Sequence, residues 1–120
     1  MGSVRITGIL TLIMICLSAC STTRYTWNHY DDKLYQHYKN PAENEKFIEG
    51  LKVTIEDGEK TGTVPPGIYA EYGYTFYETG NYSEAAEYFQ KEYDKWPESR
   101  VFMSKMINNA KKLENKYPNK

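Results

Sequence analysis

The sequence is poor in the residues from which most catalytic and metal sites are built. It has two cysteines and two histidines among 120 residues. It contains no glycine-rich phosphate-binding motif, and its serines lack the sequence context of a catalytic nucleophile. Its 15 basic and 16 acidic side chains almost cancel, so there is no excess of positive charge to attract nucleic acid. We therefore expect no enzyme and no nucleic-acid partner.

Metal binding is not expected either. His29 and His37 are eight residues apart, with Asp31 and Asp32 between them. Eight residues correspond to about 12 Å along a helix, too far for two side chains to share one ion without help from another element. We expect these four residues on the surface.

Residues 1–19 have the layout of a cleavable secretory signal peptide. Arg5 is the only charged side chain there, and Ile6–Leu17 is an apolar run. A helix of that length spans about 18 Å, less than the roughly 30 Å of a bilayer core. A retained transmembrane helix is the alternative. Cleavage would remove Cys16 and leave Cys20 without a disulfide partner.

The four residues Leu17–Cys20 resemble the bacterial lipobox, in which an aliphatic residue and two small residues precede a cysteine. This resemblance implies cleavage between Ala19 and Cys20, and a covalent diacylglycerol and N-acyl chain on Cys20. Each buried methylene contributes about 0.8 kcal/mol, so such chains would hold the protein firmly to a membrane. Ser21 takes the place where an inner-membrane lipoprotein usually has Asp. We expect an outer-membrane lipoprotein that faces the periplasm, tethered through residues 20–26 and without other cofactors.

Residues 27–64 predict two helices, because their apolar residues recur every three or four positions. The helix at 27–39 has apolar residues at Tyr30, Leu34, Tyr35 and Tyr38. The helix at 42–60 follows the start signal Asn40-Pro41 with Glu43 and ends before Gly62 and Pro65-Pro66. Its apolar stripe consists of Phe47, Ile48, Leu51 and Ile55.

Residues 65–99 resemble a tetratricopeptide repeat, a 34-residue unit of two antiparallel helices. Gly73 and Ala85 fall where the two helices would approach most closely, Gly80 falls at the turn, and Pro97 ends the unit. Large residues fill the space around them: Tyr69, Tyr72, Phe76 and Phe89. Glu92 departs from the repeat, which usually has Ala there, and suggests that this face is less buried than in a long array.

Residues 100–120 complete the prediction with a capping helix that would cover the exposed face of the pair. Its apolar positions are Phe102, Met103, Met106, Ile107, Ala110 and Leu113. No run alternates apolar and polar residues well enough for a strand. We therefore expect an all-α fold of about five helices, with one TPR-like helix pair between flanking capping helices.

The resemblance to a tetratricopeptide repeat also implies which residues face its concave groove. These are Gly67, Ala70, Tyr74 and Tyr77, with Glu78 beside them. We expect Ala70, Tyr74, Tyr77 and Glu78 to contact a partner, because the repeat core does not need them and aromatic side chains often anchor interfaces. Alternatively, both tyrosines pack under the N-terminal segment with Trp27, Tyr30 and Tyr38.

Three stretches, at 27–41, 65–73 and 96–99, resemble a family of small bacterial outer-membrane lipoproteins of unknown function. Its members are often encoded beside a lipoprotein similar to the curli secretion pore. The resemblance implies an interaction module in an envelope assembly or secretion-associated complex, with another envelope protein, such as that pore-like lipoprotein, as its partner. A structural subunit of an oligomeric outer-membrane lipoprotein complex, without a separate groove, is the alternative.

Overall fold

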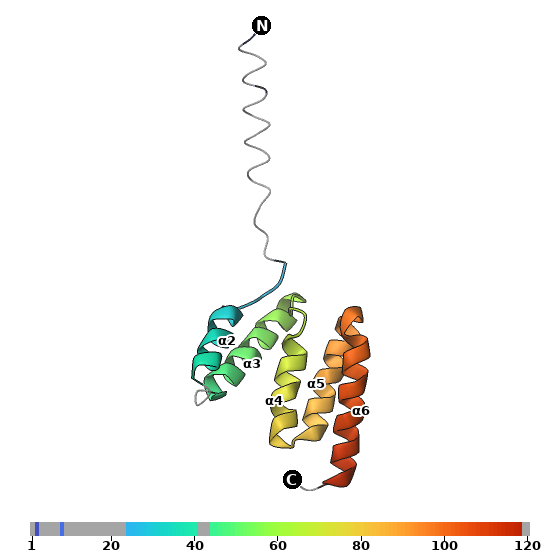
Figure 1. Ribbon diagram of the computed structural model, residues 1–120. Coiled ribbons are helices and arrows are strands. Elements are labelled where there is room, and N and C mark those ends of the chain that lie inside the picture. Colours follow the sequence, from blue (N-terminus) through green and yellow to red (C-terminus); the bar gives the residue numbers. More distant parts are fainter. Residues whose placement is uncertain (1, 3–7, 9–23, 41–43, 119–120) are drawn as a thin grey trace.

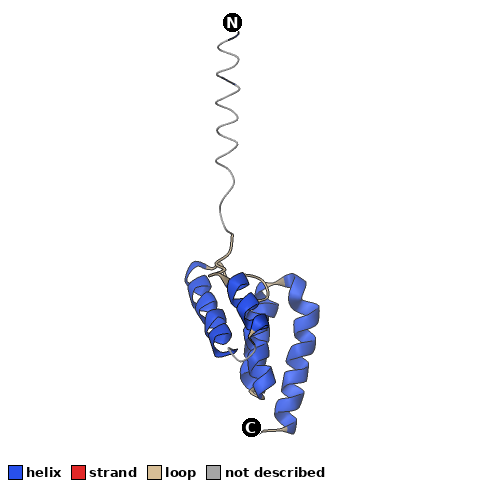
Figure 2. Cartoon of the chain, turned by 60° about the vertical axis from the view of Figure 1, so that its left-hand side comes forward, coloured by secondary structure: helices blue, strands red, loops and turns tan. Residues whose placement is uncertain are grey.

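The computed structural model describes residues 2, 8, 24–40 and 44–118. Between residues 24 and 118 the described chain forms α-helices and one short 3-10 helix but no strand (Figures 1 and 2). The elements are α2 (Tyr30–Lys39), α3 (Asn44–Thr61), α4 (Ile68–Thr79), α5 (Tyr82–Lys95), η2 (Pro97–Ser99) and α6 (Arg100–Lys116). The predicted all-α fold of about five helices is thus confirmed.

Two sequence predictions concern residues outside these ranges. The signal peptide, its cleavage site and Cys20 lie before residue 24, and Pro41 and Glu43 of the helix-start signal lie between α2 and α3. Within the described part of the chain, no helix is long and apolar enough to cross a bilayer.

Helices α4 and α5 form the predicted antiparallel pair, and their contact requires a small residue at Gly73. A Cβ atom at Gly73 would lie 3.0 Å from ring and side-chain carbons of Phe89 and Tyr88. Gly80 ends α4 with a φ of 84°, a left-handed conformation that favours glycine, and its N–H bonds to carbonyls of the last turn. The pair therefore consists of two consecutive helices joined by a short turn.

Helix α6 packs against α5 and covers the pair, with Met103, Ile107 and Ala110 buried. It begins at Arg100, directly after the 3-10 turn η2 that Pro97–Ser99 form. Phe102 is 61% exposed and lies outside the core. Because adjacent helical residues are about 100° apart, Phe102 and Met103 cannot both face α5.

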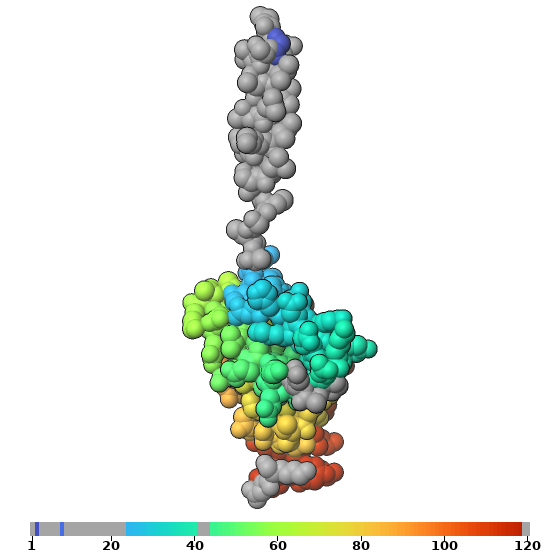
Figure 3. Space-filling view, turned by 90° about the vertical axis from the view of Figure 1, so that its left-hand side faces the viewer, coloured from blue at the N-terminus to red at the C-terminus, as the bar shows by residue number. Residues whose placement is uncertain are grey.

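Helix α3 brings the predicted stripe into a second part of the core. Phe47, Leu51 and Ile55 are buried together with Ile68 and Tyr69 of α4. The turn between α3 and α4 is tight, since its glycines, Gly62 and Gly67, both have positive φ. Figure 3 shows residues 24–39, in blue to cyan, lying against the green α3.

Helix α2 differs from its prediction in start and orientation. It begins at Tyr30 because Asn28 and His29 both have left-handed backbone conformations. None of its residues is buried. It faces α3 through Tyr30, Lys33 and His37, with His37 stacked on Phe47, so Leu34, Tyr35 and Tyr38 are left exposed.

Candidate partner-binding groove

A groove runs between α4 and α6, and Phe89 of α5 lies at its bottom. The groove has a volume of about 370 Å³. Helices α4 and α6 lie on either side of α5 and begin at the same end of the domain (Figure 1). The lining residues are Gly67, Ala70, Glu71, Tyr74, Phe89, Phe102, Met103 and Met106.

The two walls of the groove expose large apolar side chains. Tyr74 on α4 is 47% exposed and Phe102 on α6 is 61% exposed. Met106 is partly buried and adds a flexible, polarizable side chain. Such a surface can take up the apolar face of another chain, because burying these side chains removes apolar area from water.

The structure places the four predicted contact residues in different environments. Ala70 and Tyr74 line the groove, whereas Tyr77 and Glu78 are outside the lining. Tyr77 stacks on Tyr74, with 6.0 Å between ring centroids, and also packs against the core at Phe89. Glu78 is exposed. Neither tyrosine makes a ring contact with Trp27, Tyr30 or Tyr38 among the described residues.

The sequence analysis missed the wall that α6 supplies, because it assigned Phe102, Met103 and Met106 to one buried stripe. That stripe has the ordinary width of an amphipathic helix, so the sequence held no signal that Phe102 would lie at its exposed edge. Glu71 was missed as well. It lines the groove and accepts a hydrogen bond from the Tyr30 hydroxyl of α2. The pKa of Tyr30 is raised, mainly because the side chain is partly buried and also because it donates the hydrogen bond to Glu71.

The expectation that the face around Glu92 is less buried than in a long repeat array was wrong, because the Glu92 side chain is completely buried. Its Oε1 accepts hydrogen bonds from the N–H of Gly67, at 2.7 Å, and from the hydroxyl of Ser99, at 3.0 Å. Burial raises the pKa of Glu92, while these donors act in the opposite direction. The start of α4 is a favourable place for a carboxylate, because free N–H groups and the helix dipole meet there.

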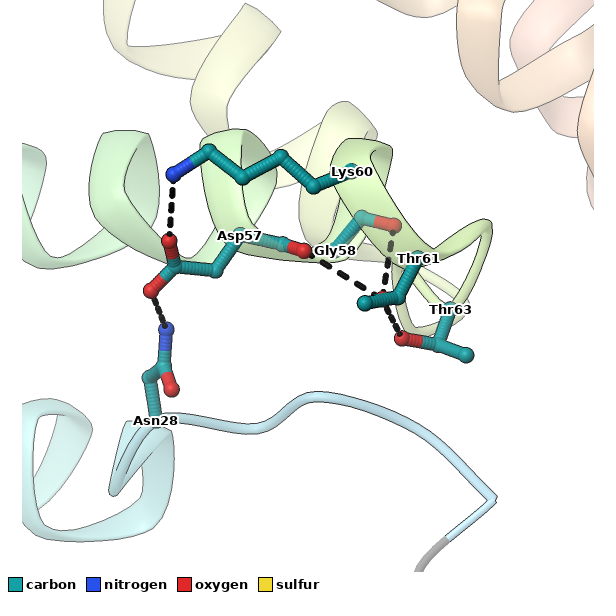
Figure 4. A network of polar contacts seen from close by, with 6 residues as sticks. All are labelled: Asn28, Asp57, Gly58, Lys60, Thr61 and Thr63. Carbon is teal, nitrogen blue, oxygen red and sulfur yellow. Dashed lines mark hydrogen bonds and ion pairs between the residues drawn. The ribbon is translucent and has the colours of Figure 1, made fainter.

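The N-terminal segment is attached to the domain near the start of the groove. The N–H of Thr26 donates to the carbonyl of Thr63, at 3.0 Å. The side chain of Asn28 donates to Asp57, which also pairs with Lys60 (Figure 4). These bonds hold residues 26–28 against the end of α3 and the turn that follows it.

The histidines of the segment and of α2 lie apart from the groove. His29 is exposed, with its Nδ1 3.7 Å from a carboxylate oxygen of Asp32. His37 is stacked on Phe47 at 4.5 Å between ring centroids. In the part of the chain that the structure describes, no three His, Cys, Asp or Glu side chains gather as metal ligands would.

No curated protein and no solved structure matches the chain. One protein family does match it, over residues 24–106, and this family is defined by a domain of unknown function, DUF4810. The match includes α2 to α5, the first part of α6 and every residue that lines the groove. The chain therefore belongs to the DUF4810 family.

Proposed function

We propose that the protein is a membrane-anchored lipoprotein that acts as a protein–protein interaction module in a bacterial envelope assembly. Acyl chains on Cys20 would hold it at the outer membrane, facing the periplasm. The groove between α4 and α6 would receive a segment of another envelope protein. The observation that carries this proposal is the exposure of Tyr74 and Phe102 on opposite walls of one apolar groove.

The chemistry of the groove indicates what the partner offers. Its lining is almost entirely aliphatic, aromatic or thioether, with Glu71 as the one charged residue. An amphipathic helix or an extended segment with two or three apolar anchors would fit such a lining. The wall residues Tyr74 and Phe102 would contribute most, because large aromatic side chains tend to dominate interface energies.

The same lining favours binding over catalysis. Apart from Glu71, it contains no carboxylate, imidazole, thiol or amine to serve as an acid, base or nucleophile. Glu71 is occupied by the hydroxyl of Tyr30. We therefore propose that the groove binds a partner and catalyses no reaction. The acyl chains on Cys20 are the only attached groups that we propose for the protein.

The test is recovery of partners from cross-linked membranes. The variants Tyr74→Ala and Phe102→Ala each remove one wall of the groove and should both lose the same envelope protein. Val101→Ala is the matched control, because Val101 is 74% exposed, adjoins Phe102 and does not line the groove. Unchanged recovery with both wall variants would remove the groove from the proposal.

Two further measurements separate the parts of the proposal. Intact-mass analysis of the processed protein should show a diacylglycerol and an N-acyl chain on Cys20, and an unmodified thiol would rule out the anchor. A stable homo-oligomer whose size is unchanged by Tyr74→Ala and Phe102→Ala would instead favour the structural subunit without a separate groove.

A further inference from the structure

Both tryptophans of the chain lie in one aromatic cluster where the N-terminal segment joins the domain. Tyr25 contacts Trp96 edge-on at 5.6 Å between ring centroids, and contacts Trp27 at 6.4 Å. Trp27 is 40% exposed. Trp96 follows directly after α5, so the cluster joins residues more than 65 positions apart at one end of the domain.

The cluster lies close in sequence to the residue proposed to carry the acyl chains. Tyr25 is five positions after Cys20, and even a fully extended chain spans at most about 18 Å over five positions. Tyr25 is already held by Trp96, and Thr26 by Thr63. An anchor on Cys20 would therefore keep this end of the domain within about 18 Å of the lipid headgroups.

The side chains at this end suit a headgroup surface. Tyr and Trp rings prefer the boundary between water and hydrocarbon, where an apolar ring and a polar tip are both satisfied. Arg24 lies over the Tyr25 ring at 5.8 Å, and Lys95 over the Trp96 ring at 5.8 Å. Lys95 also donates to the carbonyl of Gly62, at 3.1 Å, whereas Arg24 is exposed and is the cation that would reach a lipid phosphate. Asp94 and Glu98 flank Trp96 and are exposed, so the aromatic rings rather than net charge would hold this surface to lipid.

We infer that the aromatic cluster of Tyr25, Trp27 and Trp96 lies at the phospholipid surface of the membrane in which Cys20 is anchored, with the exposed Trp27 in contact with lipid and the partly buried Tyr25 and Trp96 behind it. This inference depends on the lipid anchor of the proposed function and adds an orientation to it. Helices α4 and α6 begin at the cluster end of the domain (Figure 1). The groove would then run away from the bilayer and remain open to a partner.

The natural tryptophans report on this contact directly. The full-length processed protein is purified and reconstituted into vesicles of phosphatidylethanolamine and phosphatidylglycerol, with or without brominated acyl chains that quench nearby tryptophan. Wild-type emission should fall strongly in the brominated vesicles. Trp27→Phe should lose most of this quenching, because the remaining Trp96 is less exposed than Trp27.

A tryptophan at the opposite end of the domain is the control. Asn81→Trp, in a background of Trp27→Phe and Trp96→Phe, places the reporter at the turn between α4 and α5, and its emission should be the same in both kinds of vesicle. Equal quenching at both ends, or no quenching of the wild type, overturns the inference. Intact-mass analysis of the same sample then shows which proposal has failed. If Cys20 carries lipid, the anchor stands and only the contact of the cluster with lipid is wrong. If Cys20 has a free thiol, both the anchor and the contact are wrong.

Discussion

The backbone N–H of Gly67 donates to Oε1 of Glu92 across 25 residues of sequence, at 2.7 Å. The hydroxyl of Ser99 donates to the same oxygen, so one carboxylate joins the start of α4, the body of α5 and the turn that leads into α6. The first N–H groups of a helix have no partner within the helix. Glu92 supplies one from outside, and it does so where the groove begins.

We expect Glu92→Ala to destabilise the domain by about 2–4 kcal/mol, because it leaves two donors unpaired and opens a cavity. Glu92→Gln should cost far less, since the amide oxygen can accept both hydrogen bonds and no charge is buried. Urea unfolding of the two variants beside wild type measures the difference. Equal losses for Ala and Gln would mean that the charge, rather than the hydrogen bonds, holds the helices together.

The burial of Glu92 also predicts a dependence of stability on pH. Its pKa in the folded protein is raised above the ordinary value of 4.5, so the folded state binds this proton more tightly than the unfolded state. The contribution of Glu92 to stability is therefore fully present below about pH 4.5 and falls as the pH rises through the raised pKa. Wild type should gain stability relative to Glu92→Gln as the pH is lowered from neutral toward that value. A constant difference in the free energy of unfolding would contradict this.

How much of this structure could be predicted depends on the range of the interactions involved. The α4–α5 pair is specified locally, since Gly73 permits the close contact and Gly80 the turn between consecutive helices. The role of Glu92 could not be predicted, because its donors belong to residues distant in sequence or in the next turn. A glutamate at a repeat position that usually holds Ala indicated that this face is less buried. In the structure Glu92 is buried instead, because Gly67 and Ser99 donate hydrogen bonds to its carboxylate.

Only one of the two walls of the groove could be predicted, because only that wall depends on interactions within one repeat. Its α4 wall, with Ala70 and Tyr74, follows from helical spacing within one repeat. Its α6 wall depends on how the last helix turns about its own axis against α5, and an apolar stripe that includes both Phe102 and Met103 does not determine that rotation. Periodicity likewise placed Tyr35 and Tyr38 on an apolar face of α2, but the helix packs through Tyr30 and His37.

Two buried glycines of α3 provide a matched test of close packing. A Cβ atom at Gly58 would lie 2.8 Å from the Cα of Val64, whereas at Gly50 it would meet the flexible side chain of Lys33. Alanine is favoured over glycine within a helix by about 1 kcal/mol at both positions. Gly50→Ala should therefore leave stability unchanged or raise it slightly. Gly58→Ala should lower it by about 1–3 kcal/mol, because backbone must move. Thermal unfolding of both variants checks this, and similar melting temperatures would contradict it.

The bond between Tyr30 and Glu71 predicts how α2 is held. No residue of α2 is buried, so this hydrogen bond across to α4 should account for much of its docking. Tyr30→Phe should weaken that docking by about 1.5–3 kcal/mol, the range for hydrogen bonds to charged groups. Hydrogen exchange should then accelerate in α2 while the amides of α4 and α5 stay protected. Tyr35→Phe is the control, since Tyr35 is exposed on the same helix, and acceleration in both variants would argue against the bond.

Tyr74 and Tyr77 stack on each other, yet truncation of Tyr77 should mainly lower stability, whereas truncation of Tyr74 should mainly weaken binding. Tyr77 packs against the core cluster that contains Phe89, so Tyr77→Ala should lower stability by about 1–3 kcal/mol through lost burial. Tyr74 is 47% exposed, and Tyr74→Ala should cost less than about 1 kcal/mol. Urea unfolding at neutral pH measures both losses. Only Tyr74→Ala then reports on the groove itself, because a partner lost with Tyr77→Ala could follow from a loosened fold. A loss of stability as large for Tyr74 as for Tyr77 would show that Tyr74 belongs to the core and not to a binding surface.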